Sequence, residues 1–194
     1  MTELRTITPA DLATILANHA LWLADDPAGA CADLRLADLR GVNLRGVNLC
    51  RANLRYADLS GANLSHASLA GADFSNASLR GARLRSADLC SATLIGANLQ
   101  GADLGYAVLR EAELQFANLR EANLRSADLR DIDLGCTELI DGGSDTRGNR
   151  FVGIDTADGR RVLAGFVDLT IAAARVYWAK NADALARVEV IAAA

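Results

Sequence analysis

Apolar side chains recur with a period of five residues between positions 31 and 140. Leucine occupies every fifth position from Leu34 to Leu139 in 22 consecutive registers, with Phe74 as the exception. The position two residues earlier is alanine in 18 of the 22 registers. An α-helix would spread such leucines around its circumference, and a strand would alternate them between faces. The chain must therefore turn a corner every five residues, which predicts a solenoid.

A pattern typical of an amphipathic helix precedes the repeat. Thr8 and Pro9 provide an N-cap followed by proline at the first helical position. One helical face then collects Leu12, Ile15, Leu16, His19, Trp22 and Leu23. We expect residues 1–30 to form a capping helix and loop, because an open solenoid end exposes unpaired backbone groups and bare leucines.

The five-residue period ends after Leu139. Residues 141–145 have the composition of a turn-rich linker, and residues 150–154 and 161–163 flank Ala157-Asp158-Gly159 as in a β-hairpin. Apolar residues at helical spacing follow and predict a helix with Asp168 or Thr170 as its N-cap: Phe166, Leu169, Ala173, Val176 and Tyr177. A second, short helix is predicted from Asp183 onward. Residues 141–194 are therefore expected to form a small C-terminal subdomain of hairpin and helices.

The repeat units resemble those of the pentapeptide-repeat family, whose consensus is A(D/N)LXX. Ala52-Asn53-Leu54-Arg55-Tyr56 and Ala57-Asp58-Leu59-Ser60-Gly61 are examples, and the resemblance covers 110 of the 194 residues. It implies an all-β fold, a right-handed quadrilateral β-helix with four pentapeptides per coil. The 22 units would then make about 5.5 coils and a rod ~26 Å long. Leucines 20 residues apart would stack, and the larger Phe74 would widen its coil or displace its neighbours.

Glycine also recurs once per coil, at Gly41, Gly61, Gly81 and Gly101. The simplest interpretation is a turn position that requires a positive φ or a tight backbone. The alternative is a flat surface that allows close approach of a partner.

Composition and cysteine spacing narrow the class of protein. Aromatic residues make up 5% of the chain, so small aliphatic side chains must fill the core. The net charge of −4 argues against direct binding of nucleic acid. Neither a signal-peptide pattern in residues 1–10 nor an apolar run of membrane-spanning length occurs, so we expect a soluble cytoplasmic protein. Its four cysteines lack CxxC spacing and are expected to be reduced thiols; they are Cys31, Cys50, Cys90 and Cys136.

The charges of the repeat are balanced, with 13 acidic and 12 basic residues over positions 31–140. Some pentapeptide-repeat proteins mimic DNA, bind DNA gyrase and protect it from quinolones. A rod ~26 Å long that imitates duplex charge density would need about 15 net negative charges. The balance favours a solvated, mixed surface instead. Arginines on successive faces of the last coils form a candidate surface for an acidic partner: Arg120, Arg125 and Arg130.

We find no constellation for catalysis, a metal or a cofactor. A rod filled with leucine offers no concave pocket in which catalytic groups converge. His19 is expected to pack on the capping helix, and His66 to face water at a repeat corner. Cys50 and Cys90 would lie two coils, or ~10 Å, apart on one face, which is too far for a disulfide.

The flanking sequences resemble those of phage-associated members of the family. The similar strings are His19 to Leu23, Arg161 to Gly165 and Leu169 to Trp178. Four aromatic residues are candidate capping or dimer contacts, with both roles left open: Trp22, Phe166, Tyr177 and Trp178. We therefore expect a non-enzymatic scaffold, structural or protein-binding, encoded by a phage or prophage and without cofactors. A DNA-mimic binder of gyrase is the alternative function, and homodimerisation through the C-terminal subdomain is the alternative assembly.

Overall fold

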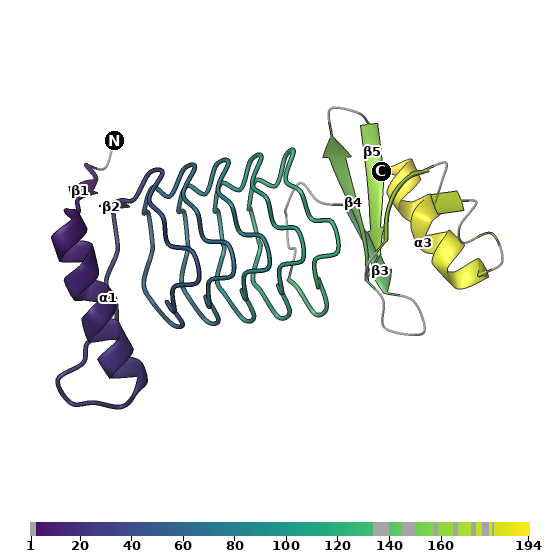
Figure 1. Ribbon diagram of the computed structural model, residues 1–194. Helices are drawn as coiled ribbons and strands as arrows, with labels where there is room; N and C mark the ends of the chain where they lie inside the picture. Colours follow the sequence, from purple (N-terminus) through teal and green to yellow (C-terminus); the bar gives the residue numbers. More distant parts are fainter. Residues whose placement is uncertain are drawn as a thin grey trace.

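The computed structural model describes residues 3–133, 140–144, 150–156, 159–164, 167–171, 174–175, 179 and 181–194. A solenoid lies between an N-terminal helix and a C-terminal sheet that carries a second helix (Figure 1). The elements follow the order β1 (Arg5–Thr6), α1 (Pro9–Leu23), β2 (Ala37–Asp38), β3 (Ile140–Ser144), β4 (Arg150–Thr156), β5 (Gly159–Ala164), β6 (Val167–Thr170) and α3 (Ala182–Ala193).

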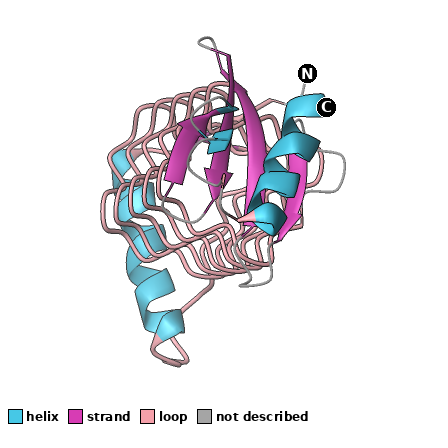
Figure 2. Cartoon of the chain, turned by 90° about the vertical axis from the view of Figure 1, so that its right-hand side faces the viewer, coloured by secondary structure: helices cyan, strands magenta, loops and turns pink. Residues whose placement is uncertain are grey.

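Parallel bridges between residues 20 positions apart build the solenoid, from Asp33 with Asn53 to Glu113 with Asp133. The Asp73 amide donates to the carbonyl of Ala52 at 2.9 Å, and the Leu54 amide donates to the carbonyl of Asp73 at 2.7 Å. Five complete coils result, numbered 1 to 5 here: 32–51, 52–71, 72–91, 92–111 and 112–131. They stack along one axis in Figure 1 and overlie one another in Figure 2.

A β-turn closes each pentapeptide. In one of them the Ala57 amide donates to the Leu54 carbonyl at 3.1 Å, and Tyr56, the third turn residue, has a φ of 59°. A positive φ at the third position alone is the signature of a type II turn. The glycine column has φ values of 63–67° at the same position, as the turn interpretation predicts. However, 13 solenoid turns place a residue other than glycine there, so this geometry does not by itself require glycine.

Leucine and alanine fill the interior of the solenoid. The central leucines are 0% exposed from Leu49 to Leu109, and Leu129 in coil 5 is 7% exposed. Phe74 is also completely buried, in the column of Leu54 and Leu94. The inward positions of coils 1 to 5 are thus used for packing, and a partner of the solenoid would contact its outward side chains.

Helix α1 covers the first coil. Thr8 caps it: the Asp11 amide donates to Thr8 Oγ1 at 3.1 Å, and the Thr8 amide donates to Asp11 Oδ2 at 3.2 Å. The Thr8 hydroxyl also donates to Asp11 Oδ2 at 2.7 Å, and this bond, together with the one from the Thr8 amide, holds the pKa of Asp11 below its usual range. Four partly buried side chains of this region pack on the solenoid core: Ile7, Leu12, Ile15 and Leu16.

The N-terminal segment also satisfies the backbone edge of coil 1. Strand β1 pairs in parallel with β2, and the Arg5 amide donates to the carbonyl of Leu36 at 2.6 Å. The Ala32 amide donates to Nδ1 of His19 at 3.1 Å. His19 is 0% exposed and stacks on Trp22, with ring centroids 5.5 Å apart.

The C-terminal part is an antiparallel sheet of order β3-β4-β5-β6, with α3 as its helix. Strands β4 and β5 pair as the hairpin pattern predicts, with Val152 opposite Leu163. Its core is separate from that of the solenoid and contains Val162, Ala174, Ala184, Val188 and Ile191.

Two sequence-based expectations for this part are wrong. Ile140–Ser144, read partly as a linker, forms β3, where a register shift between Asp141 and Gly143 accommodates the glycines. Leu169 and Asp168, expected in or at the start of a helix, lie in β6, because that strand satisfies the free edge of β5. The rest of the predicted stripe lies outside the described residues: Phe166, Ala173, Val176 and Tyr177.

Candidate binding surface

The solenoid presents four outward faces, each centred on one column of inward side chains. Face A is centred on Leu34, Leu54, Phe74, Leu94 and Leu114, and face B on Leu39, Leu59, Leu79, Leu99 and Leu119. Face C is centred on Leu44, Leu64, Leu84, Leu104 and Leu124, and face D on Leu49, Leu69, Leu89, Leu109 and Leu129. On each face, the residues immediately before and after the central side chain are partly or fully exposed in most coils.

The Asp or Asn that precedes many of the leucines has a local structural role. Oδ1 of Asp33 accepts a hydrogen bond from the Arg35 amide at 3.2 Å, and Oδ1 of Asn53 accepts one from the Arg55 amide at 3.2 Å. This Asx geometry stabilises the turn that follows and works equally with a neutral amide. The negative charge at such positions is therefore not needed for the turn.

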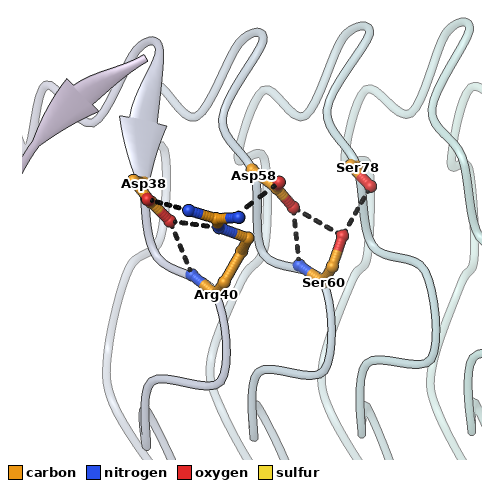
Figure 3. A network of polar contacts seen from close by, with 5 residues as sticks. All are labelled: Asp38, Arg40, Asp58, Ser60 and Ser78. Carbon is orange, nitrogen blue, oxygen red and sulfur yellow. Dashed lines mark hydrogen bonds and ion pairs between the residues drawn. The ribbon is translucent and has the colours of Figure 1, made fainter.

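Ion pairs neutralise many of these carboxylates. On face B, Nη2 of Arg40 lies 2.6 Å from Oδ2 of Asp38, and its Nε lies 3.8 Å from Oδ2 of Asp58 in the next coil (Figure 3). Asp58 also accepts from the Ser60 amide at 3.0 Å, and the hydroxyls of Ser60 and Ser78 are 2.8 Å apart. The Arg40 hydrogen bonds hold the pKa of Asp38 below its usual range.

Faces A and D have comparable pairs. Arg35 binds Asp33 on face A, with Nη2 and Oδ2 2.7 Å apart. On face D, Arg130 binds Asp128 through Nη2 and Oδ2 at 2.6 Å, while Arg110 lies 3.7 Å from the same carboxylate. The hydrogen bonds from arginine lower the pKa of Asp33 and of Asp128.

Face C differs because none of its arginines forms an ion pair in the described part of the chain, although Nη1 of Arg85 and Oδ1 of Asp103 both lie beside Gly105. It carries four exposed arginines and one carboxylate, Asp103; the arginines are Arg45, Arg83, Arg85 and Arg125. Asp103 instead accepts from the Gly105 amide at 3.1 Å and from Nδ2 of Asn123 at 2.7 Å. Within the part of the chain that the structure describes, none of the four arginines forms an ion pair.

The two corners that border face C differ in the size of their side chains. The corner toward face B is the glycine column from Gly41 to Gly101, where an added Cβ would meet nothing within 4 Å. The corner toward face D carries His66 and Tyr106, both exposed. The guanidinium of Arg85 lies over the Tyr106 ring, 4.6 Å from its centroid.

The residues singled out from sequence are distributed over the molecule. Arg120, Arg125 and Arg130 occupy faces B, C and D of coil 5 and do not share one face. Trp22 is half-buried against His19. Phe166, Tyr177 and Trp178 lie outside the described residues.

The cysteines of the described ranges form no disulfide. Cys31, Cys50 and Cys90 are free there, and Cys136 falls outside them. Cys31 Sγ donates to the Arg51 carbonyl at 3.3 Å, and burial together with nearby Asp33 raises the pKa of the thiol. No group of three or more His, Cys, Asp or Glu side chains among the described residues is arranged to hold a metal ion. In the same ranges no helix is long and apolar enough to cross a membrane.

Sequence reasoning missed the basic face. It counted charges over the whole repeat, where they cancel, rather than along each column. The signal was present as an alternation on face C: Arg45, Ser65, Arg85, Gly105 and Arg125 follow one another at intervals of 20 residues.

These features define a class of protein: a β-solenoid of four-turn coils with a closed interior and flat outer faces. The pentapeptide-repeat family model matches eight copies over residues 32–69, 57–94, 67–105 and 92–131. The chain belongs to the pentapeptide-repeat family. No protein of curated function matches it in sequence.

Solved structures of pentapeptide-repeat proteins are similar to this chain. The protein Rfr23 from the cyanobacterium Cyanothece 51142 is 31% identical with a TM-score of 0.55, over 65% of this chain and 93% of its own. A pentapeptide-repeat protein from the Arabidopsis thaliana thylakoid lumen is 29% identical with a TM-score of 0.31, over 51% and 69% respectively. QnrB1, a plasmid-mediated fluoroquinolone resistance protein, is 23% identical with a TM-score of 0.35, over 62% of each chain.

Proposed function

We propose that this protein is a non-enzymatic scaffold that binds a protein partner through an outer face of its solenoid. The observation that carries the proposal is the difference between inward and outward residues of the solenoid. The inward side chains are buried in the core, and the outward ones form flat faces of different charge. Flat, hydrogen-bonded surfaces with exposed arginines suit association with another protein, in which arginine is enriched.

The charge distribution favours this role over DNA mimicry. Face A, the most acidic face, has three carboxylates in coils 1 to 5, Asp33, Asp73 and Glu113, and a fourth, Asp133, just beyond them, against Arg35 and Arg55. Duplex DNA of the same ~24 Å length would carry about 14 negative charges. Two of the four carboxylates are also paired with arginine. We therefore expect micromolar protein to leave DNA gyrase supercoiling unchanged, and inhibition of that reaction would contradict the proposal.

We further propose that residues 1–30 and 141–194 act as caps on the repeat, residues 31–140. Leu129 in coil 5 is only 7% exposed, which supports a covered end, and α1 supports a covered beginning. Trp22, Phe166, Tyr177 and Trp178 are the proposed capping contacts. Light scattering that gives a dimer, which Trp178→Ala converts to a monomer, would assign the C-terminal aromatics to subunit pairing instead. A cytoplasmic location and a phage or prophage origin remain predictions from the sequence.

The test of the scaffold role is affinity capture from lysate of the source organism. Immobilised wild-type protein is compared with a variant carrying Arg45→Glu, Arg85→Glu and Arg125→Glu. We expect at least one protein to be retained by the wild type and lost from the variant, and to bind again when purified. Absence of any retained protein, or turnover of a small molecule by the purified chain, would refute the proposal.

A further inference from the structure

Three arginines of face C form a straight row along the rod. Arg45, Arg85 and Arg125 occupy the same position of the pentapeptide in coils 1, 3 and 5, and all three are exposed. The intervening coils place Ser65 and Gly105 at this position. At ~4.8 Å per coil, neighbouring arginines of the row are about 10 Å apart.

This spacing discriminates between kinds of partner. Carboxylates on one side of an extended strand repeat every ~6.8 Å, so only part of a strand would stay in register with the row. Carboxylates seven residues apart on an α-helix lie on one face and are ~10.5 Å apart. Over the whole row the helix drifts by only about 2 Å, which the length of an arginine side chain accommodates.

The surroundings of the row favour a partner of limited negative charge. Faces A, B and D carry carboxylates next to their arginines, and these would repel a polyanion that wrapped the rod. A duplex nucleic acid of ~24 Å would present about 14 charges to four arginines. The corner between faces B and C has no side chain in coils 1 to 4, where it is glycine, and carries Glu121 in coil 5.

We propose that face C docks an acidic α-helix of a protein partner, whose carboxylates, spaced seven residues apart, pair with Arg45, Arg85 and Arg125. The inference rests on the proposed scaffold function and adds the chemistry of the partner. Arg83 increases the positive charge at the centre of the row, and the Tyr106 corner orients Arg85 through its ring contact.

Face B provides a matched control. It has the same alternation, with Arg40, Arg80 and Arg120 in coils 1, 3 and 5, but also the carboxylates of Asp38 and Asp58, whereas Glu121 lies at the corner that both faces share. Arg40 already pairs with Asp38 and Asp58. A triple alanine variant at these three arginines removes the same charge from equivalent positions of the neighbouring face.

The experiment measures binding of fluorescent peptides by anisotropy at low and physiological salt. The probe is an alanine- and glutamine-based helix with glutamates every seven residues, and its control has the same composition with glutamates every five. We expect the seven-residue peptide to bind wild-type protein about tenfold more tightly, as three pairs of ~0.5 kcal/mol each would give. The triple variant Arg45→Ala, Arg85→Ala and Arg125→Ala should lose this preference, while the face B variant keeps it.

Equal binding of the two peptides, or equal losses in the two triple variants, would overturn the inference, because attraction would then follow net charge alone. Tighter binding of a single-stranded oligonucleotide of equal charge, lost in the face C variant, would also overturn it and identify face C as a nucleic-acid surface. Circular dichroism checks that both variants retain the wild-type fold. Failure of the peptide test together with capture of a protein from lysate would refute the acidic helix and leave the scaffold function standing.

Discussion

At the scale of single residues, the same side chain serves the turn and the surface. Oδ1 of Asn53 and Oδ1 of Asp38 each accept the backbone amide two residues on, so Asp and Asn are equivalent for the fold. The choice between them sets the charge of each face. Face C has Asn43, Asn63 and Asn123 in this column, so Asp103 is the single carboxylate there and no arginine of the face forms an ion pair in the described part of the chain.

This separation of roles predicts different effects of two substitutions at Asn53. Asn53→Ala removes the acceptor for the Arg55 amide and should lower the free energy of unfolding by about 1 kcal/mol. Asn53→Asp keeps the acceptor and should change it by less than about 0.5 kcal/mol. Urea denaturation followed by circular dichroism measures both. Equal destabilisation by the two substitutions would show that the amide group itself, and not its oxygen, is required.

Turn geometry gives a second prediction at this scale. Gly81 has a φ of 63°, and a Cβ there would meet nothing within 4 Å, so Gly81→Ala isolates the backbone cost. We expect a loss of about 1 kcal/mol in the free energy of unfolding. Glu121 has a φ of 59° at the equivalent corner of coil 5, and Glu121→Gly should raise stability. Shifts of the same sign for both variants in urea denaturation would contradict this account of the corner.

At the scale of elements, α1 covers the first coil, and its His19 is hydrogen-bonded to that coil. The imidazole of His19 accepts the Ala32 amide through Nδ1, and its Nε2 is buried without a hydrogen-bond partner. The Cys50 backbone and the Trp22 ring lie against it. Burial lowers the pKa of His19 below its ordinary 6.5, and the nearby Cys50 backbone opposes this effect only in part.

Acid should therefore loosen the N-terminal cap. Because the folded pKa is lower than the unfolded one, the stability contributed by neutral His19 is present above pH 6.5 and is lost as pH falls through the folded pKa. A protonated Nδ1 could also no longer accept the hydrogen bond from the Ala32 amide, and two N–H donors would then face each other. Hydrogen exchange of the Ala32 amide, corrected for intrinsic rates, should accelerate between pH 7 and pH 5. His66→Gln, which changes an exposed histidine, serves as the control and should leave this dependence intact; an unchanged Ala32 rate in the wild type would refute the mechanism.

At the scale of the whole molecule, two separate cores divide the chain. The solenoid core runs from Ala32 to Ile132, whereas Val162, Val188 and Ile191 belong to the C-terminal core. Solenoid coils contact their neighbours at intervals of 20 residues, which makes that part quasi-one-dimensional. The two parts are therefore expected to respond separately to core mutations.

Val188→Ala tests this division. The fully buried Val188 should cost about 2 kcal/mol in the C-terminal part when truncated. Hydrogen exchange should then accelerate at the Val162 amide and remain unchanged at the Leu84 amide. Leu84→Ala is the reciprocal variant, since Leu84 is fully buried in the solenoid. Loss of protection in both parts from either variant would indicate a single cooperative unit.

Sequence reasoning succeeded where the determinants are local and repeated. The five-residue period and the Thr8-Pro9 start led to the solenoid and to α1, because each depends on side chains within one turn of chain. It failed at Leu169, whose apolar spacing fits a helix but which pairs with Val162 in the sheet. The competing partner lies in another strand, so local spacing could not reveal it.

The sequence by itself determined the periodic fold, the burial of its leucines and the use of all inward positions for packing, because a five-residue repeat has one way to keep those side chains inside. Tertiary structure decided which outward residues are neighbours. Stacking at 20 residues aligns Arg45 with Arg85 and Arg125, while ion pairing with Asp38 and Asp58 neutralises Arg40 on the adjacent face. A charge count along the chain averages over these faces, whereas a partner meets one face at a time.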